Sequence, residues 1–198
     1  MGVATGAAAA GGDVQLVGKT GEDAAGEAAL LDLAKRGVGH VAMLRDAGRA
    51  TPELADPAAA DLAPFDEPEV AQASQDPGAP GPTLDAADIE LALRYLPDYR
   101  VVVVADALSG AALEVVLAAS RWSGAALVIL VPAGSDAPTL TSEATVIEAP
   151  EVDPDDEFAS VVGAYAAALD RGEEPAEAFA TASASAGWAA VADAAVAD

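Results

Sequence analysis

Residues 100–132, RVVVVADALSGAALEVVLAASRWSGAALVILVP, contain a valine-rich run, a helical pattern and a second apolar run in succession. Valine on both faces of the first run, 100–106, is typical of a central parallel strand that is buried between two helix layers. The second run, 125–132, predicts another fully buried strand, and the pattern at 110–122 predicts the helix between them. A strand, a helix and a strand in this order predict parallel pairing through a right-handed crossover.

The alternation of strands and helices continues on both sides of this stretch. Short apolar or alternating runs predict further strands, and apolar stripes with helical spacing predict further helices. We therefore predict an α/β fold for residues 1–198, a three-layer αβα sandwich with a mainly parallel sheet in a single domain. The other expected strands are 14–18, 39–45 and 143–150, and the other expected helices are 21–37, 84–96, 154–170 and 175–195.

Local signals mark the ends of several of these helices. Asp85, with Asp88 three residues later, matches an N-terminal capping pattern, and Gly37 matches a helix stop. Between residues 51 and 83, in contrast, proline and acidic residues recur and interrupt both periodicities. We expect this segment to be a long loop or a remnant lid within the domain.

The chain is strongly acidic, with 33 Asp and Glu residues against 9 Lys and Arg and a formal net charge of −24. Nucleic-acid binding requires a basic footprint, and an anionic membrane attracts basic segments, so we expect neither partner. A hydrophobic fraction of 53% argues against disorder. At molar salt the Debye length falls to about 3 Å, which screens the self-repulsion of such a surface. We therefore expect a halophilic origin, the alternative being an ordinary acidic protein.

Cysteine is absent from the chain, and His40 is the one histidine. A disulfide, a thiolate metal site and a cysteine nucleophile are excluded, and a histidine zinc site or a Ser-His-Asp triad nearly so. The longest apolar runs fall far short of the roughly 20 residues of a membrane-spanning helix, and no basic segment precedes the alanine-rich start. We expect a soluble, cytoplasmic protein.

Two apparent phosphate loops fail on inspection. GDVQLVGKT, 12–20, has five residues instead of four between its glycines, and its strand lies inside the motif instead of before it. We expect Lys19 to be a solvated residue at a strand end. GVGHVA, 37–42, lacks the third glycine of a dinucleotide fingerprint.

The order of the elements carries a family resemblance. GGDVQLVGKTGEDAAGEAALLDLAKRGV, 11–38, resembles the early part of the ribokinase-like, or PfkB, carbohydrate kinase family, in which a strand ending in a G-x-x-G-(D/E)-D turn leads into a helix. RDAGRATP, 45–52, resembles the entry to the lid of that family, and residues 158–190 resemble its closing pair of helices. The resemblance implies a truncated ribokinase-like fold.

In that family, catalysis depends on a D-T-x-G-A-G-D motif directly before the closing helices. Backbone N–H groups of the motif hold the transferred phosphoryl group, and its last Asp deprotonates the sugar hydroxyl. Aligned on Gly163, the motif falls on degenerate positions in this chain, and the resemblance implies that no catalytic residue remains among them. These positions are Asp153 at the first Asp, Asp156, Glu157 and Phe158 across Gly-Ala-Gly, and Ala159 at the base.

Other family elements are also missing. The register from Gly11 places the sugar-contacting Asn of the family at Gly2, and the short bridge after residue 132 omits the N-x-x-E element that organises magnesium and phosphate. The acids at the start of the expected helix have a local explanation, because carboxylates in a first helical turn gain about 0.3–1 kcal/mol each from the helix dipole. We expect Asp153 to be the N-cap and Pro154 to occupy the first helical position.

These observations favour a degenerate PfkB-like pseudoenzyme that binds a small ligand or a protein partner, or forms a homodimer, and that needs no cofactor. The alternative is a divergent ATP- and Mg²⁺-dependent carbohydrate or nucleoside kinase that uses carboxylates at strand ends. Its candidate ligand-binding residues are Asp106, after the strand at 101–105, and Asp136, after the strand at 125–132. A decaying paralogue without a selected role, or a true start further upstream, also stays open.

Overall fold

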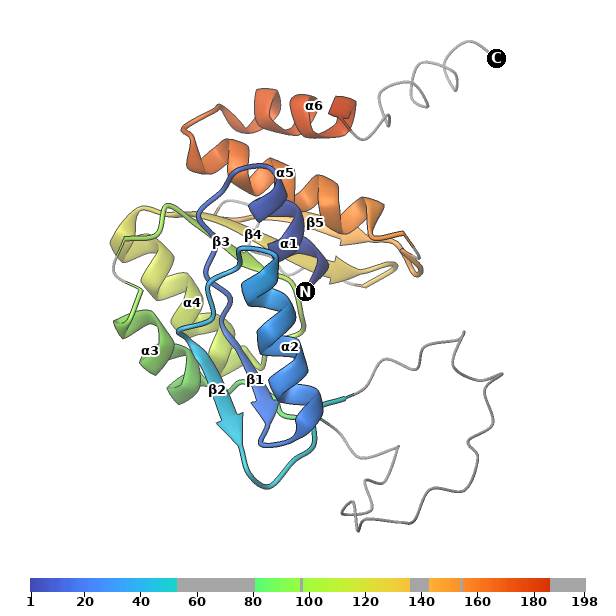
Figure 1. Cartoon of the computed structure of the whole chain (residues 1–198). Coiled ribbons are helices and arrows are strands. Elements are labelled where there is room, and N and C mark those ends of the chain that lie inside the picture. The colour runs from blue at the N-terminus through green and yellow to red at the C-terminus, as the bar shows by residue number, and fades with distance from the viewer. Residues whose placement is uncertain (53–80, 97, 136–142, 154, 186–198) are drawn as a thin grey trace, which may run out of the picture.

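The computed structural model describes residues 1–52, 81–96, 98–135, 143–153 and 155–185. Within these residues, helices and strands alternate along the chain (Figure 1). Every pair of strands in them is parallel, as the alternation predicts. The elements are α1 (Gly2–Ala9), β1 (Gly18–Gly21), α2 (Ala24–Lys35), β2 (Met43–Asp46), α3 (Ala86–Arg94), β3 (Val101–Val104), α4 (Gly110–Ser123), β4 (Ala126–Pro132), β5 (Thr145–Ala149), α5 (Glu157–Asp170) and α6 (Pro175–Ser185).

The larger sheet has three strands in the order β3-β4-β5. Its middle strand is β4, whose Leu127, Val128 and Ile129 are all buried. The prediction that the valine run at 100–106 is central was wrong, because among the described strands β3 lies at one edge of the sheet and only its Val104 is buried. A β-branched run shows that helices cover both faces of a strand, but it carries no information about which strands flank it.

Helices cover both faces of this sheet, which confirms the three-layer α/β prediction (Figure 1). On β4, Leu127 and Ile129 point into one core with residues of α3 and α4, and Val128 points into a second core with residues of α5 and α6. Alternate residues of a strand face opposite sides, so one strand serves both cores. The α3–α4 core contains Ile89, Ala112, Val116 and Leu117, and the α5–α6 core contains Val161, Tyr165, Ala168, Ala178 and Ala182.

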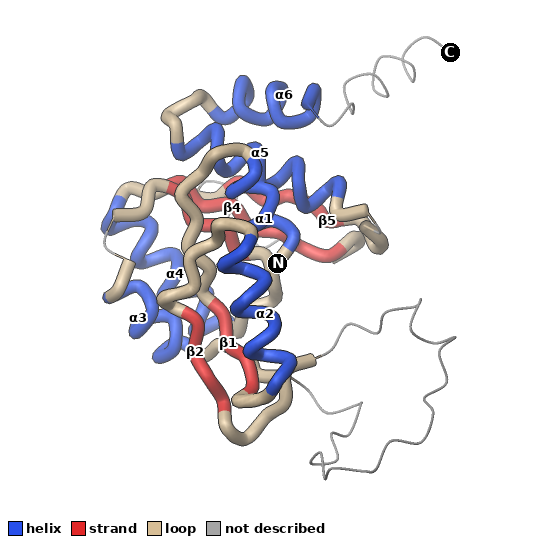
Figure 2. The backbone as a smooth tube through the Cα atoms, in the orientation of Figure 1, coloured by secondary structure: helices blue, strands red, loops and turns tan. Residues whose placement is uncertain are grey.

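The first two strands form a separate sheet, and Figure 2 shows them apart from the larger one. β1 pairs with β2 from Gly18 opposite Met43 to Gly21 opposite Asp46. The strands expected at 14–18 and 39–45 are thus seen at 18–21 and 43–46, and within the expected ranges Gln15 and Gly39 form an isolated parallel bridge. The apolar residues that prompted the first prediction, Val14 and Leu16, pack instead into a small core with Leu33 and Val38.

Helix α1 was not predicted, and it packs against α5 through small residues. The contacts run in the same order along both helices, since Gly2 lies beside Ala159, Gly6 beside Ser160, and Gly12, just after α1, beside Ala167. A Cβ atom added at Gly163 would lie 2.5 Å from the carbonyl oxygen of Val3. The two backbones meet so closely because glycine occupies the crossing point on both helices.

Several helix boundaries are as predicted and others differ. The capping box of Asp85 and Asp88 at α3 is present, and Gly37 just after α2 has a positive φ. The helix expected from residue 154 begins at 157, and the one expected at 175–195 is seen over Pro175–Ser185. Residues 53–80 of the expected loop at 51–83 lie outside the described residues. None of the described helices is long and apolar enough to cross a bilayer.

Candidate functional site

The first turn of α5 is where the family resemblance places a phosphate-binding backbone. The Asp153 carboxylate accepts hydrogen bonds there from two backbone N–H groups: Oδ1 from Phe158 at 3.0 Å and Oδ2 from Ala159 at 2.9 Å. The first N–H groups of a helix have no partner within the helix and attract anions. In this chain the anion that binds two of them is the protein's own side chain.

The turn before α5 differs from the predicted cap. Asp156 is the N-cap, its side chain makes no capping bond, and its backbone is left-handed, with φ 54° and ψ 24°. No other non-glycine residue in the described part of the chain has a positive φ. The prediction that Asp153 is the N-cap was wrong, because the N-cap is Asp156, and the turn at Asp156 lets the carboxylate of Asp153 reach α5 from three residues before the cap. Pro154 lies outside the described residues.

The N-terminus of α1 lies against the same turn. A Cβ atom on Gly2 would lie 2.9 Å from Oδ1 of Asp156 and 2.8 Å from Cβ of Ala159. Two helix N-termini, each carrying partial positive charge, therefore meet beside the Asp153 and Asp156 carboxylates, which offset that charge. An incoming phosphate would have to displace Asp153 and approach the exposed carboxylates of Asp155, Asp156 and Glu157.

Replacing Asp153 by alanine is expected to lower the free energy of unfolding by about 1 kcal/mol, because the two N–H groups of α5 lose their acceptor. Urea denaturation in a phosphate-free buffer measures this loss. Asp155→Ala, which removes an exposed carboxylate from the same turn, is the matched control and is expected to change stability by less than half as much. Equal losses for the two variants would show that charge at the helix end matters and that the two bonds of Asp153 do not.

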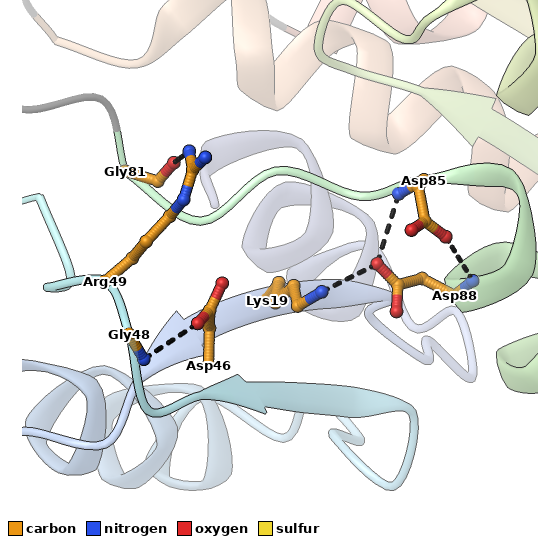
Figure 3. Close-up of polar contacts among 7 residues, drawn as sticks. All are labelled: Lys19, Asp46, Gly48, Arg49, Gly81, Asp85 and Asp88. Atoms are coloured by element: carbon orange, nitrogen blue, oxygen red, sulfur yellow. Dashed lines mark hydrogen bonds and ion pairs between the residues drawn. The ribbon is translucent and has the colours of Figure 1, made fainter.

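A second group of charged residues surrounds Lys19 on β1 (Figure 3). Lys19 Nζ lies 2.8 Å from Oδ2 of Asp88 on α3, and both side chains are only 18% exposed. The same Oδ2 accepts the backbone N–H of Asp85 at 3.1 Å, so the capping box and the ion pair share one carboxylate. The prediction of a solvated Lys19 was wrong: the residue links the small sheet to α3.

Electrostatics in this group favour the charged form of both partners. The hydrogen bond to Asp88 raises the pKa of Lys19, more than partial burial lowers it, and the charges of Asp46 and Asp85 add to the rise. Burial tends to raise the pKa of Asp88, but the bonds from Lys19 and from the Asp85 N–H outweigh it and hold that pKa below its ordinary value. The lysine is thus neutralised by carboxylates and is a poor ligand for a phosphate.

A third polar group joins the start of α2 to the loop after β2. Asp23 Oδ1 accepts the N–H of Gly26 at 2.8 Å and the hydroxyl of Thr51 at 2.7 Å, and Oδ2 accepts the N–H of Thr51 at 2.7 Å. The Thr51 hydroxyl in turn accepts the N–H of Gly21 at 2.8 Å. These bonds, first of all the one from the Thr51 backbone, lower the pKa of Asp23.

Of the two strand-end carboxylates of the alternative hypothesis, the structure describes Asp106. Asp106 is exposed after β3, and its Oδ1 accepts the N–H of Ala107 at 2.7 Å, as a loop-capping residue does. Asp136 lies outside the described residues. Within the part of the chain that the structure describes, no three acidic or histidine side chains form a group that could hold a metal ion.

Sequence reasoning located one of these places and missed the other two. The degenerate positions 153–159 do gather at the start of α5, around the backbone N–H groups of Phe158 and Ala159. The pairing of Lys19 with Asp88 spans 69 positions and leaves no local trace in the sequence. A partial signal was available for Asp23, which stands three residues before Gly26 at the start of an obvious helix, but Thr51 as its partner was not predictable.

Comparison with known proteins adds little to this description. No protein-family model matches the chain, and no curated protein matches it either. Among solved structures it is similar to a fructokinase from Xylella fastidiosa with bound ATP, at 14% identity and a TM-score of 0.49 over 91% of this chain and 75% of that one. It is also similar to a PfkB protein from Polaromonas sp. JS666, at 18% identity and a TM-score of 0.45 over 94% of this chain and 62% of that one.

A third similar structure is an uncharacterized sugar kinase from Pyrococcus horikoshii, at 13% identity and a TM-score of 0.39 over 82% of this chain and 48% of that one. The chain thus spans between about half and three quarters of the length of these proteins. At such identities and TM-scores, the likeness says nothing about the activity of this chain.

Proposed function

We propose that this chain is a degenerate relative of PfkB-type sugar kinases that transfers no phosphoryl group and acts by binding a protein partner or a small ligand. The observation that carries the proposal is the Asp153 carboxylate, which occupies the backbone N–H groups of Phe158 and Ala159. A site for phosphoryl transfer has to leave such groups free for the transferred phosphate.

The charges around the two N-terminal helix ends support the same proposal. Phosphoryl transfer depends on cations that neutralise the developing negative charge. Around the start of α5 the side chains are instead carboxylates, those of Asp153, Asp155, Asp156 and Glu157. Ala159, at the position where the resemblance expects a base, has no group that can accept a proton, and Lys19 is already paired with Asp88.

The direct test is ADP release from ATP and Mg²⁺ with a panel of sugars and nucleosides, measured in molar KCl because the chain carries a formal charge of −24. We expect the rate with every acceptor to equal the rate without acceptor. Turnover that Asp153→Ala or Asp156→Ala abolishes would contradict the proposal. Turnover that Asp106→Ala abolishes and Asp153→Ala leaves intact would instead favour the divergent kinase with strand-end carboxylates.

A further inference from the structure

A groove of about 480 Å³ runs along β5 on the α5–α6 side of the larger sheet. Its floor and walls come from β5, α5 and α6, which follow one another in the chain. The groove is lined by Thr145, Val146, Ile147 and Glu148 of β5, Tyr165 of α5, and Pro175, Ala176 and Phe179 of α6. The groove is shallow and open to solvent, so it can contact side chains of a partner without enclosing them.

The strand beside this groove is an edge strand. Among the described residues, β5 pairs with β4 on one side and with no strand on the other. Within the part of the chain that the structure describes, one side of the β5 backbone therefore has no strand partner, and its N–H and C=O groups can pair with an added extended segment. A groove next to an open edge fits a polypeptide whose alternate side chains enter the groove.

The groove contains a rigid, exposed aromatic side chain. Phe179 is 45% exposed and packs edge-on against Tyr165, with ring centroids 5.8 Å apart. Tyr165 itself is 2% exposed within the α5–α6 core, so it supports Phe179 firmly. Aromatic side chains, Phe among them, are enriched in the cores of protein interfaces.

The charges at the groove select the kind of partner. Glu148 of β5 is exposed beside it, and its Oε1 accepts the N–H of Gly134 at 2.6 Å. The exposed Glu174 and Glu177 flank the lining residues of α6, whereas no Lys or Arg is among the lining residues. Arg171, the nearest cation along the chain, is paired with Glu173 at 2.9 Å. A second copy would bring the same carboxylates to this edge, so a basic partner fits better.

We propose that the open edge of β5 and its groove bind an extended polypeptide segment in which apolar side chains alternate with Lys or Arg. The segment pairs with the free backbone of β5, and its apolar side chains point to the α6 side and contact Phe179. Its basic side chains point to the opposite face of the sheet and meet the exposed Glu148, which lies opposite Val131 on that face. This proposal rests on the proposed function as an interaction protein and gives it a surface and a class of partner.

The test uses the full-length chain and short fluorescent peptides, with anisotropy as the readout. A peptide of alternating Lys and Val is expected to bind, while peptides of alternating Glu and Val or of alternating Lys and Ser bind at least about tenfold more weakly. Phe179→Ala and Glu148→Lys are each expected to weaken the Lys-Val peptide about tenfold. The matched controls are Leu91→Ala and Glu114→Lys, exposed residues of α3 and α4 on the other layer, and they are expected to leave binding unchanged.

Three results would overturn the proposal. One is binding of the Lys-Val peptide that Phe179→Ala leaves intact in a chain with an unchanged circular dichroism spectrum. If that variant does not fold, Ala176→Trp, which adds bulk at an exposed position in the groove, has to block binding instead. The second is equal binding of the Lys-Val and Glu-Val peptides. The third is a dimer, seen by sedimentation, that Phe179→Ala dissociates while no peptide binds, which would assign the groove to a second copy.

ADP release by the same samples would refute the absence of kinase activity without changing the binding result, so the two failures are distinguishable.

Discussion

Gly163→Ala is expected to lower the free energy of unfolding by about 2 kcal/mol. Overpacking costs about 1–3 kcal/mol, and we expect the upper end of this range here. The higher helix propensity of alanine offsets up to about 1 kcal/mol of that cost. The added Cβ would meet the backbone nitrogen of Ala7, the carbonyl oxygen of Val3 at 2.5 Å and the carbonyl carbon of Gly6 at 2.7 Å. All three atoms belong to the backbone of α1, so no side chain can rotate away, and α1 has to move off α5.

Gly110→Ala is the matched control for this substitution. Gly110 also lies in a helix, at the start of α4, but a Cβ atom there would find no atom within 4 Å. The control is expected to leave stability unchanged or to raise it by up to about 1 kcal/mol. Urea denaturation of both variants measures the difference. A Gly163→Ala protein as stable as the Gly110→Ala protein would show that α1 does not pack on α5 in solution.

The packing of α1 also bears on the candidate site. Because Gly2 lies beside Asp156 and Ala159, any movement of α1 off α5 opens the side of the turn that precedes α5. Two features therefore cover this turn: the carboxylate of Asp153, which accepts the first N–H groups of α5, and the packing of α1 on α5.

The parts of the fold that the sequence predicted are those whose signals are local. The capping box at α3 needs only Asp85 and Asp88, and the buried strand β4 needs only its own apolar run. Helix α1 was missed because alanine and glycine give no hydrophobic period, and its stability comes from the fit of Gly6 against α5. The two sheets were predicted as one because strand order depends on packing between distant segments.

At the candidate site, too, local signals were predictable from the sequence and contacts between distant residues were not. First-turn acids at α5 were expected to satisfy the helix end, and acids do lie there, but the residue positions differed. A left-handed residue is uncommon outside glycine, so the turn at Asp156 could not be read from the sequence, and it decides that Asp153 reaches Phe158 and Ala159. The partial burial of Lys19 could not be predicted from the sequence either, because it results from the packing of β1 against α3.

Asp23→Ala is expected to lower the free energy of unfolding by about 3 kcal/mol, because it removes three bonds to a charged acceptor at once, one of them the N-cap bond of α2. The partners left without an acceptor are the N–H of Gly26 and the N–H and hydroxyl of Thr51. The substitution also frees the loop after β2, since Thr51 is held to α2 through this carboxylate. Asp32→Ala, which removes an exposed acid that pairs with Arg36 on the same helix, is expected to cost at most about 0.5 kcal/mol.

The pH dependence of this difference tests its cause. The pKa of Asp23 is lowered in the folded chain from an ordinary value of 3.8, first by the bond from the Thr51 backbone and then by the bond from Gly26. A carboxyl group with a lowered pKa stabilises the fold fully above its unfolded pKa, and this contribution is lost as the pH falls toward the folded pKa. The gap between the wild type and Asp23→Asn, measured by urea denaturation, is therefore expected to be constant above about pH 5 and to shrink below about pH 4. A gap that stays constant through the acid range would mean that shape alone, and not the charge of the carboxylate, holds Thr51 on α2.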